Sequence, residues 1–324
     1  MTVNTPTFAD VEHAAFVLAS YAVATPLIEN PDLNAQVGAR VLLKCENLQR
    51  TGSFKFRGAF NRISRIPLEQ RRQGVVAFSS GNHAQGVAAA AALLSIPALI
   101  VMPQDAPKAK IEGTRNRGAE IVFYDRLHDN REAIARRICE DPASKWHGAT
   151  LVPPFDDLYV VAGQGTVGLE IATDAKERGL PNIDWLLAPC SGGGLVSGIA
   201  LAFSVLSPAT EICSVEPENF DGMRQSMQAG ERVPAPGGAL SVADALMAPM
   251  PGFIPFALAQ QHLAHGLTVD DKALLHAVSY AERMLKLVVE PGGAAALAYL
   301  LVNATRFKDA LVAIVLSGGN AGRN

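Results

Sequence analysis

Short apolar runs alternate along the chain with longer segments in which apolar residues recur at helical spacing. In the first half, this pattern predicts strands at residues 40–44, 75–78, 98–102 and 120–124. The segments around these strands predict helices at residues 8–21, 54–65, 83–94, 108–117 and 129–139. Strands that alternate with helices favour parallel pairing through right-handed crossovers, so we expect a parallel α/β unit.

The second half of the chain repeats this alternation with different contents. It predicts strands at residues 184–188, 211–215 and 311–316. It also predicts a glycine-interrupted helix at 159–176, helices at 195–205 and 292–302, and a helix at 270–285 capped by Thr268. The expected fold class is therefore α/β, with ligands bound beyond the carboxyl ends of the strands.

Composition and charge narrow the classes of function. The chain has 324 residues and a formal net charge of −3, so it is long enough for two domains and shows no basic excess that would favour nucleic acid. The longest apolar stretch, residues 87–102, contains Ser95 and Pro97 and is shorter than the roughly 18 residues that a membrane-spanning helix needs. The four cysteines show no paired short spacing. We therefore expect a cytoplasmic protein with reduced thiols that binds neither nucleic acid nor membrane.

The most unusual chemical group is Lys55, which lies between Phe54 and Phe56 at the predicted start of a helix. Ser53 is placed to cap this helix, and Lys55 then falls in its first turn. The positive end of the helix dipole and the apolar flanks both disfavour the ammonium form, so we expect a lowered pKa for Lys55. A lysine with a lowered pKa is a nucleophilic amine that can form a Schiff base. On the sequence alone, a solvated lysine that tolerates this position is the alternative.

A glycine-rich loop, Ser-Gly-Gly-Gly at residues 191–194, separates a predicted strand from a predicted helix. Backbone amides without side chains at a helix N-terminus can converge on an anion, so we interpret the loop as a phosphate site. No Gly-Lys-Ser/Thr follows it, and Leu195, Val196 and Ser197 stand where a dinucleotide fingerprint needs spaced glycines. The loop therefore suits a monophosphate better than ATP or NAD. A tight turn that binds nothing is the alternative.

Two further polar loops follow predicted strands. The first, Ser-Ser-Gly-Asn-His at residues 79–83, offers hydroxyl, amide and backbone donors at a helix N-terminus, which suits a carboxylate or a phenolic oxygen. The second, Ser-Gly-Gly-Asn at residues 317–320, places a hydroxyl beside glycines that let a flat ring approach. The alternatives are a plain helix cap for the first loop and a terminal turn for the second.

An amine nucleophile, a phosphate loop and a slot for a ring together describe pyridoxal 5'-phosphate. The segments 53–59, 79–86, 191–194 and 317–320 resemble motifs of the fold-type II pyridoxal-phosphate enzymes. The nearest group is the serine/threonine dehydratases, or threonine ammonia-lyases, together with serine racemase. The resemblance runs in order from Thr25 to Asn320, which is nearly the whole chain.

The resemblance implies a two-domain, three-layer α/β/α fold like that of tryptophan synthase β. Residues 1–70 and 153–324 would form a large domain that binds the cofactor, and residues 71–152 a small, mobile domain. Ser191 stands where the dehydratases often have a fourth glycine, which we expect to be tolerated because the backbone amide does the binding.

Roles for individual residues follow from the same resemblance. Lys55 would bind the cofactor aldehyde and act as a catalytic base, Asn82 would contact the phenolic oxygen, and Ser317 the ring nitrogen. Ser80 would be a second catalytic residue, donating a proton on the face opposite Lys55. The cofactor-binding residues expected are Phe54, Lys55, Asn82, Ser191, Gly192, Gly193, Gly194, Leu195 and Ser317. The substrate-binding residues expected are Ser79, Ser80, Asn82 and His83.

The implied reaction is the conversion of a β-hydroxy amino acid, of the threonine or serine type, to a 2-oxo acid and ammonia. A serine or aspartate racemase and a β-replacement synthase of the cysteine synthase kind are alternatives on the same fold. A catalytically silent anion-binding regulator is the alternative from another class. We expect a homodimer whose partner molecules are amino-acid substrates.

A divalent cation is a further hypothesis, because some members of the family hold one after the strand that ends here at Glu216. Glu216 and Asp221 keep a pair of carboxylates, whereas Gly222 replaces an acidic ligand. Carboxylate oxygens suit Mg²⁺ or Ca²⁺. No metal ligand is assigned on this basis.

Overall fold

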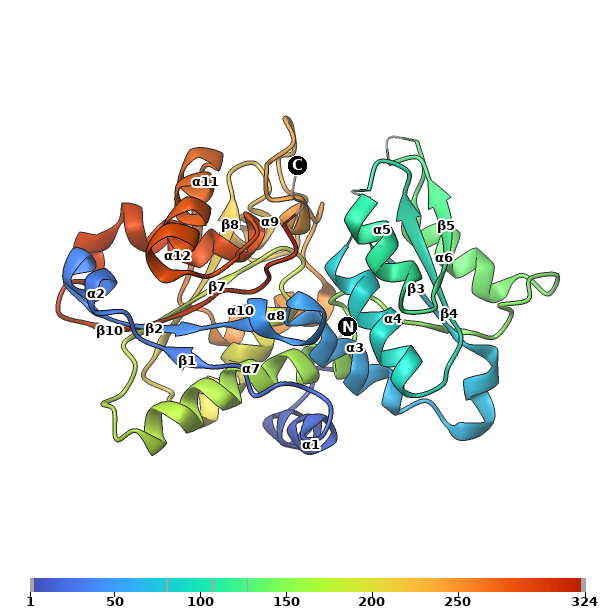
Figure 1. Cartoon of the computed structure of the whole chain (residues 1–324), viewed down its shortest axis with the longest axis horizontal. Coiled ribbons are helices and arrows are strands. Elements are labelled where there is room, and N and C mark those ends of the chain that lie inside the picture. The colour runs from blue at the N-terminus through green and yellow to red at the C-terminus, as the bar shows by residue number, and fades with distance from the viewer. Residues whose placement is uncertain (1–2, 80, 107, 127, 322–324) are drawn as a thin grey trace.

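The computed structural model describes residues 3–79, 81–106, 108–126 and 128–321. It contains two sheets, each with helices packed against it, and they lie on either side of helix α3 (Lys55–Ser64) (Figure 1). The α/β class predicted from the sequence is confirmed.

The larger sheet has six strands in the order β1-β2-β10-β7-β8-β9. All neighbouring strands are parallel except β1 and β2. The central strand β10 comes from the end of the chain, with Leu311 opposite Arg40 of β2 and Val312 opposite Trp185 of β7. The strands are β1 (Leu27–Ile28), β2 (Arg40–Lys44), β7 (Trp185–Pro189), β8 (Glu211–Pro217), β9 (His265–Val269) and β10 (Leu311–Val315).

Side chains of the larger sheet alternate between two apolar layers. Leu42 and Leu186 pack with α7 and α8, whereas Leu43 and Leu187 pack with α2, α11 and α12. Burial on both faces explains why these strands are nearly continuous apolar runs. The helices around this sheet are α1 (Phe8–Leu18), α2 (Pro31–Val37), α7 (Leu158–Glu177), α8 (Gly194–Leu206), α9 (Gly222–Ala229), α10 (Phe253–His262), α11 (Asp271–Tyr280) and α12 (Ala295–Val302).

The smaller sheet has four parallel strands in the order β5-β4-β3-β6. Its strands are β3 (Val75–Phe78), β4 (Ala98–Pro103), β5 (Glu120–Tyr124) and β6 (Thr150–Leu151). One face packs on α3 and α4 (Asn82–Leu93), and the other packs on α6 (Arg131–Glu140). A further helix, α5 (Lys108–Arg115), lies against α4. This sheet falls within residues 71–152, the range predicted for a small domain, and the domain boundaries themselves stay a prediction.

Helix α3 joins the two halves of the molecule. Phe56 and Phe60 pack into the core of the smaller sheet. On its other side, a Cβ on Gly58 would lie 2.7 Å from the Val160 carbonyl oxygen of α7, so only glycine fits there. The helix is thereby held between the sheets (Figure 1), and Lys55 at its start lies at their junction.

Several predicted elements differ from the structure. Helix α7 is continuous, so the predicted interruption by glycines is wrong. Those glycines lie where other helices approach closely: a Cβ on Gly163 would lie 2.7 Å from the Arg57 carbonyl oxygen of α3. Asp270 caps α11, not Thr268, because its carboxylate accepts from the Ala273 N–H at 2.7 Å.

Some elements were not predicted at all. Strands β1, β6 and β9 and helices α2, α9 and α10 fall in segments for which the pattern predicts no strand or helix. Helix α11 ends at Tyr280 and continues as a π-helical turn, Ala281–Leu285. Within the described residues, no helix is both long and apolar enough to cross a membrane.

Candidate active site

A cavity lies at the carboxyl ends of β3, β7 and β10, where the loops after these strands meet. Residues from both sheets line it, as expected for ligand sites at strand ends in α/β proteins. The structure thus brings together side chains that are far apart in the sequence. The predicted site residues that line the cavity are Phe54, Lys55, Ser79, Asn82, His83, Ser191, Gly192, Gly193, Gly194, Leu195 and Ser317. Ser80 lies outside the described residues.

Lys55 is the first residue of α3 and is half-buried in the cavity wall. Its Nζ donates to the Pro154 carbonyl oxygen at 2.7 Å and lies 5.1 Å from the centre of the Phe54 ring. Burial, followed by repulsion from Arg131, lowers the pKa of Lys55 to about 7. The predicted direction is confirmed. The contribution of Arg131 was not foreseen, because Arg131 belongs to a distant part of the sequence.

The predicted helix cap by Ser53 is wrong. The N-cap position is Phe54, and no side chain caps this helix. Ser53 instead forms an isolated antiparallel bridge with Gly318, and its buried hydroxyl has no hydrogen-bond partner among the described residues. The Phe54 N–H donates to the Ser317 carbonyl oxygen at 3.2 Å. The start of α3 is therefore fixed by backbone pairing with the loop after β10.

The glycine loop connects β7 to α8. Gly193 has φ +93°, a left-handed conformation that favours glycine. A Cβ on Gly192 would overlap the Phe155 ring, and one on Gly194 would lie 2.5 Å from Gln164 Oε1. The Ser191 hydroxyl accepts from the Ala248 N–H at 3.1 Å, so its side chain holds a neighbouring loop.

This loop fits a phosphate group. The first backbone amides of α8 have no partner within the helix, and the helix dipole adds positive potential at the same place. The glycines that lead into α8 line the cavity and leave no side chain in front of these amides. The tight geometry explains why three consecutive glycines are needed here.

The loop after β3 leads into α4. Ser79 Oγ accepts from the Gly81 N–H at 3.1 Å, and no side chain caps the helix. Asn82 Nδ2 donates to Glu290, and Asn82 Oδ1 accepts from Asn320 Nδ2 at 2.9 Å. Asn82 is thus held by residues of the larger sheet's side of the cavity. An amide has two N–H groups and two lone pairs on oxygen, so each end keeps one hydrogen-bonding position for a ligand.

His83 is buried and its tautomer follows from its partner. His83 Nε2 lies 2.9 Å from the Val152 carbonyl oxygen, which can only accept, so Nε2 carries the proton. Burial, with repulsion from Lys55, lowers the pKa of His83 to about 3, and the imidazole is neutral. The side chain therefore brings no positive charge to a substrate carboxylate, and a contact of that kind falls to its backbone N–H.

Ser317 follows β10 and is buried at the cavity wall. Its N–H donates to the Gly293 carbonyl oxygen at 3.2 Å, which fixes the backbone. A Cβ on the next residue, Gly318, would lie 2.5 Å from Glu290 Oε1. The glycines after Ser317 are thus required by close packing.

The cavity also contains groups that the sequence analysis did not single out. They include Phe78, Lys110, Arg126, Arg131, Pro154, Phe155, Asp244 and Glu290. Most of them come from loops and helices that are far apart in the sequence and meet only in the folded chain. No sequence pattern predicts that Lys110, Arg126 and Arg131 line the same cavity.

The carboxylates considered for a metal have protein partners. Both oxygens of Glu216 accept backbone N–H groups of α9, from Met223 at 2.9 Å and from Arg224 at 2.8 Å. Asp221 forms an ion pair with Arg224. Burial raises the pKa of Glu216 to about 8. Across the described residues, no three His, Cys, Asp or Glu side chains are grouped so that they could hold a metal ion.

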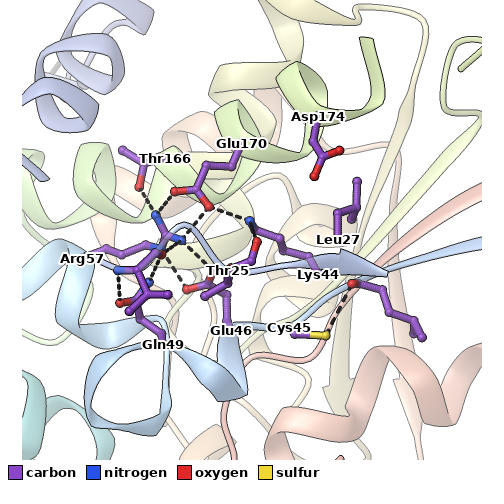
Figure 2. A network of polar contacts seen from close by, with 12 residues as sticks. Thr25, Leu27, Lys44, Cys45, Glu46, Gln49, Arg57, Thr166, Glu170 and Asp174 are labelled. Atoms are coloured by element: carbon purple, nitrogen blue, oxygen red, sulfur yellow. Dashed lines mark hydrogen bonds and ion pairs between the residues drawn. The ribbon is translucent and has the colours of Figure 1, made fainter. Parts of the chain in front are cut away.

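A buried ionic network holds α3 in place (Figure 2). The Arg57 guanidinium donates to Glu46 at 2.8 Å and to Glu170 at 2.6 Å. Lys44 Nζ donates to the same Glu170 at 2.5 Å, and Thr25 Oγ1 donates to Glu46. Arg57, Lys44 and Glu46 are almost fully buried. Through Arg57, which lies two residues after Lys55, the network links α3 to α7 and to the end of β2.

The similarity of this chain to known proteins agrees with a site for pyridoxal phosphate. The chain matches the family model described as pyridoxal-phosphate dependent enzyme over residues 19–318. The chain belongs to this family. An L-threo-3-hydroxyaspartate ammonia-lyase from a Pseudomonas species is 44% identical over 311 residues, covering 96% of this chain and 94% of the relative. An L-threonine ammonia-lyase from Thermotoga maritima is 40% identical over 316 residues, covering 97% of this chain and 75% of the relative.

Solved structures show the same similarity. Maize serine racemase superposes with a TM-score of 0.91 at 35% sequence identity, covering 98% of this chain and 95% of that one. The predicted fold-type II pyridoxal-phosphate fold is therefore confirmed. Pyridoxal phosphate is the cofactor of the family, and the glycine loop at residues 191–194, the amine of Lys55 and the Ser317 side chain, which all line one cavity, fit it.

Proposed function

We propose that this protein is an ammonia-lyase that uses pyridoxal phosphate to convert a β-hydroxy amino acid to a 2-oxo acid and ammonia. The observation that carries the proposal is that Lys55, with its lowered pKa, shares one cavity with the glycine loop and Ser317. The relatives named as ammonia-lyases support the reaction type.

We assign the cofactor contacts as follows. The Lys55 amine binds the aldehyde, the amides of residues 191–195 hold the phosphate, and the Ser317 hydroxyl meets the ring nitrogen. Asn82 contacts the phenolic oxygen with the hydrogen-bonding positions that Glu290 and Asn320 leave to it. When bound, pyridoxal phosphate supplies an electron sink that makes the Cα–H bond of an amino acid acidic.

Lys55 has a second role as the base that takes the Cα proton. With a pKa near 7, a large share of the side chain is neutral amine at neutral pH, which suits a general base. The carbonyl oxygen of Pro154 accepts from Nζ and restrains it in the cavity. The neutral Ser317 hydroxyl would not hold the ring nitrogen of a bound cofactor protonated, and this would suit loss of the β-hydroxyl better than transamination.

The substrate α-carboxylate is assigned to the loop after β3. Backbone N–H groups at the N-terminus of α4 and the Ser79 hydroxyl lie at the cavity, and a helix N-terminus attracts an anion. The named substrates of the relatives, threonine and threo-3-hydroxyaspartate, share an α-amino acid head and a β-hydroxyl. The same class, serine included, is proposed for this protein.

Ammonia and 2-oxo acid release from a panel of β-hydroxy amino acids tests the function. We expect turnover with at least one member of the panel, and a loss of activity to background in Lys55→Ala with a native circular dichroism spectrum. A wild-type protein that holds cofactor and deaminates no hydroxy amino acid would contradict the proposal and favour a silent regulator. Conversion of an activated serine plus sulfide to a new amino acid would instead identify a β-replacement synthase.

Racemisation is a second candidate, supported by the similarity to maize serine racemase. The role of Ser80 as proton donor on the face opposite Lys55 stays a prediction. If it holds, Ser80→Ala removes racemisation and the dehydration of D-substrates, while the L-substrate is affected less. Chiral chromatography of residual substrate beside the ammonia assay distinguishes the two reactions. Equal loss for both enantiomers would leave Ser80 with a binding role only.

The assembly and location are proposals as well. We infer a cytoplasmic homodimer in which residues 71–152 move as a small domain, in line with the sequence expectations. Light scattering of the purified holoenzyme measures the number of copies. A monomer that is fully active would contradict the dimer.

A further inference from the structure

Gln164 is a fully buried residue of α7 that stands between two glycines, Gly163 and Gly165. A Cβ on Gly163 would lie 2.7 Å from a backbone carbonyl oxygen of α3, that of Arg57. A Cβ on Gly165 would lie 2.8 Å from a backbone carbonyl oxygen of α8, that of Gly198. The two glycines therefore bring α7 against α3 on one side and against α8 on the other, and the Gln164 side chain lies between these two helices.

The Gln164 side chain reaches the helix that carries Lys55 and also the glycine loop. Its Cγ lies 3.1 Å from the position that a Cβ on Gly58 of α3 would take. Its Oε1 lies 2.5 Å from the corresponding position on Gly194, the last glycine of the loop and the first residue of α8. Gln164 does not itself line the cavity. The carboxamide therefore lies behind the loop, directly against its backbone.

The carboxamide of Gln164 has no hydrogen-bond partner in the part of the chain that the structure describes. Both Oε1 and Nε2 are buried and unpaired. Thr166, two residues further along α7, shows the contrast: its hydroxyl is also buried, and it donates to the Gly163 carbonyl oxygen at 2.7 Å. Leaving a buried amide unpaired is costly, and nearly all such groups in proteins have a partner. The carboxamide of Gln164 thus points to a partner that these protein groups do not supply.

The surroundings of the carboxamide favour an acceptor that belongs to an anion. The first backbone N–H groups of α8 have no partner within the helix, and the helix dipole adds positive potential there. Nε2 of Gln164 brings two further N–H donors to the same place. A phosphate group offers several acceptor oxygens, so it can satisfy the backbone donors and still accept from a side chain behind them.

We propose that Gln164 is a positioning residue for the phosphate site. From behind the glycine loop, its carboxamide donates to an acceptor oxygen that arrives with the anion, either a phosphate oxygen or a water that the phosphate holds. Anion binding thus gives a partner to an amide that has none in the protein chain, and part of the affinity for phosphate comes from this gain. The inference rests on the proposed function, in which this loop holds the cofactor phosphate.

Gln164→Met tests the proposal, because methionine has a similar length and helix propensity but no amide. Fluorescence titration of the cofactor-free chain compares two probes, pyridoxal phosphate and pyridoxal, which lacks the phosphate. We expect the affinity for pyridoxal phosphate to fall by about 10-fold or more, as for the loss of one hydrogen bond to a charged group, and the affinity for pyridoxal to stay unchanged. The cofactor-free variant should unfold at the same or a higher urea concentration than wild type, because the unpaired amide is gone.

Tyr280→Phe is the matched control. The Tyr280 hydroxyl on α11 is also buried without a partner among the described residues, but it lies on the other face of the larger sheet and does not line the cavity. Its removal should likewise leave the urea midpoint unchanged or raised, with the affinities for both probes unchanged. If Gln164→Met fails to fold, Gln164→Glu keeps the shape of the side chain, and its carboxylate should weaken the binding of pyridoxal phosphate more than that of pyridoxal.

Inorganic phosphate gives a second readout without the cofactor ring. It should raise the melting temperature of the cofactor-free wild type more than that of Gln164→Met. Equal losses of affinity for the two probes, or a lower urea midpoint with the preference for pyridoxal phosphate intact, would overturn the proposal and leave Gln164 as a packing residue or the holder of a buried water. Equal affinity of the wild type for the two probes would remove the phosphate from the loop altogether. Because all of these readouts measure binding, failure to deaminate hydroxy amino acids would overturn the ammonia-lyase function alone.

Discussion

Lys55 shows how one residue acquires its chemistry from its surroundings. Its place at the start of a helix was visible in the sequence, and so was the apolar flank of Phe54. The structure adds Arg131 and the carbonyl oxygen of Pro154, both distant in sequence. A lysine is a poor nucleophile at neutral pH when it is fully charged, and these surroundings remove much of that charge.

The lowered pKa predicts a distinct labelling profile for Lys55. Before cofactor is added, competitive acetylation should show that the reactivity of Lys55 rises with pH and levels off above about pH 7 to 8, because a depressed pKa makes the amine available early. Exposed Lys145 is the internal reference in the same digest. In Arg131→Gln the Lys55 curve should move to higher pH, since a repelling charge is gone. Identical curves for Lys55 and Lys145 would contradict the environment described here.

At the scale of elements, the loop from β7 to α8 depends on its glycines for shape. Gly193 combines a positive φ with close packing, since a Cβ there would clash with Met223. Gly230, at the end of α9, also has a positive φ, +74°, but no atom lies within 4 Å of its Cβ position. A comparison of substitutions at Gly193 and Gly230 therefore separates the effect of backbone strain, which both share, from that of a steric clash, which only Gly193 has.

We expect Gly193→Ala to lower the affinity for pyridoxal phosphate by at least 10-fold, because the loop must move away from its anion-binding shape. Gly230→Ala should cost about 1 kcal/mol of stability, with the cofactor affinity unchanged. Fluorescence titration of the cofactor and urea unfolding measure the two effects. Equal affinity in both variants would show that the loop is not the phosphate site.

The ionic network around Arg57 of α3 also holds elements together (Figure 2). Arg57→Met should destabilise the protein by about 3–5 kcal/mol, because Glu46 is left buried without its partner. Arg40→Met is the control: Arg40 pairs with Glu29 at the surface, and its loss should cost about 0–1 kcal/mol. Urea unfolding measures both, and similar values for the two variants would contradict the role given to the network.

The same network predicts a pH dependence. Burial alone would raise the pKa of Glu46, but attraction and hydrogen bonds from Arg57 outweigh it, and the pKa lies below its ordinary value of 4.5. A lowered pKa means that the stabilisation is present above about pH 4.5 and is lost as the pH falls through the folded-state pKa. The stability difference between wild type and Arg57→Met should therefore shrink at acid pH. Unfolding curves at pH 7 and pH 4 check this, and a constant difference would refute it.

The sequence predicted most strands of the two sheets because nearly all of them, such as β2, β4 and β7, are continuous buried apolar runs separated by helices. It missed β9, α9 and α10, which lie in a part of the chain without a regular alternation of apolar runs. It misjudged α7, because glycine's low helix propensity was outweighed by close packing against α3 and α8. The structure of these segments depends on tertiary contacts, which cannot be predicted from local sequence patterns.

At the scale of the whole molecule, the cavity is lined by two kinds of residue. Some belong to motifs that were recognised in the sequence, and others are cationic residues that were not. The loops at residues 79–83, 191–194 and 317–320 carry short polar or glycine-rich signals and were found. Lys110, Arg126 and Arg131 look like surface residues of three helices or loops and gain meaning only when the smaller sheet is placed opposite the larger one (Figure 1). The reaction type was thus accessible from sequence, whereas the cationic wall of the cavity could be found only in the fold.

The proposed function depends on Lys55 carrying pyridoxal phosphate at the junction between the two sheets. Borohydride reduction of the holoenzyme, followed by proteolysis and peptide mass mapping, tests it most directly. We expect one pyridoxyl phosphate group per chain, on the peptide that contains Lys55, and none in Lys55→Ala. An adduct on Lys110, which also lines the cavity, or no adduct after reconstitution, would contradict it.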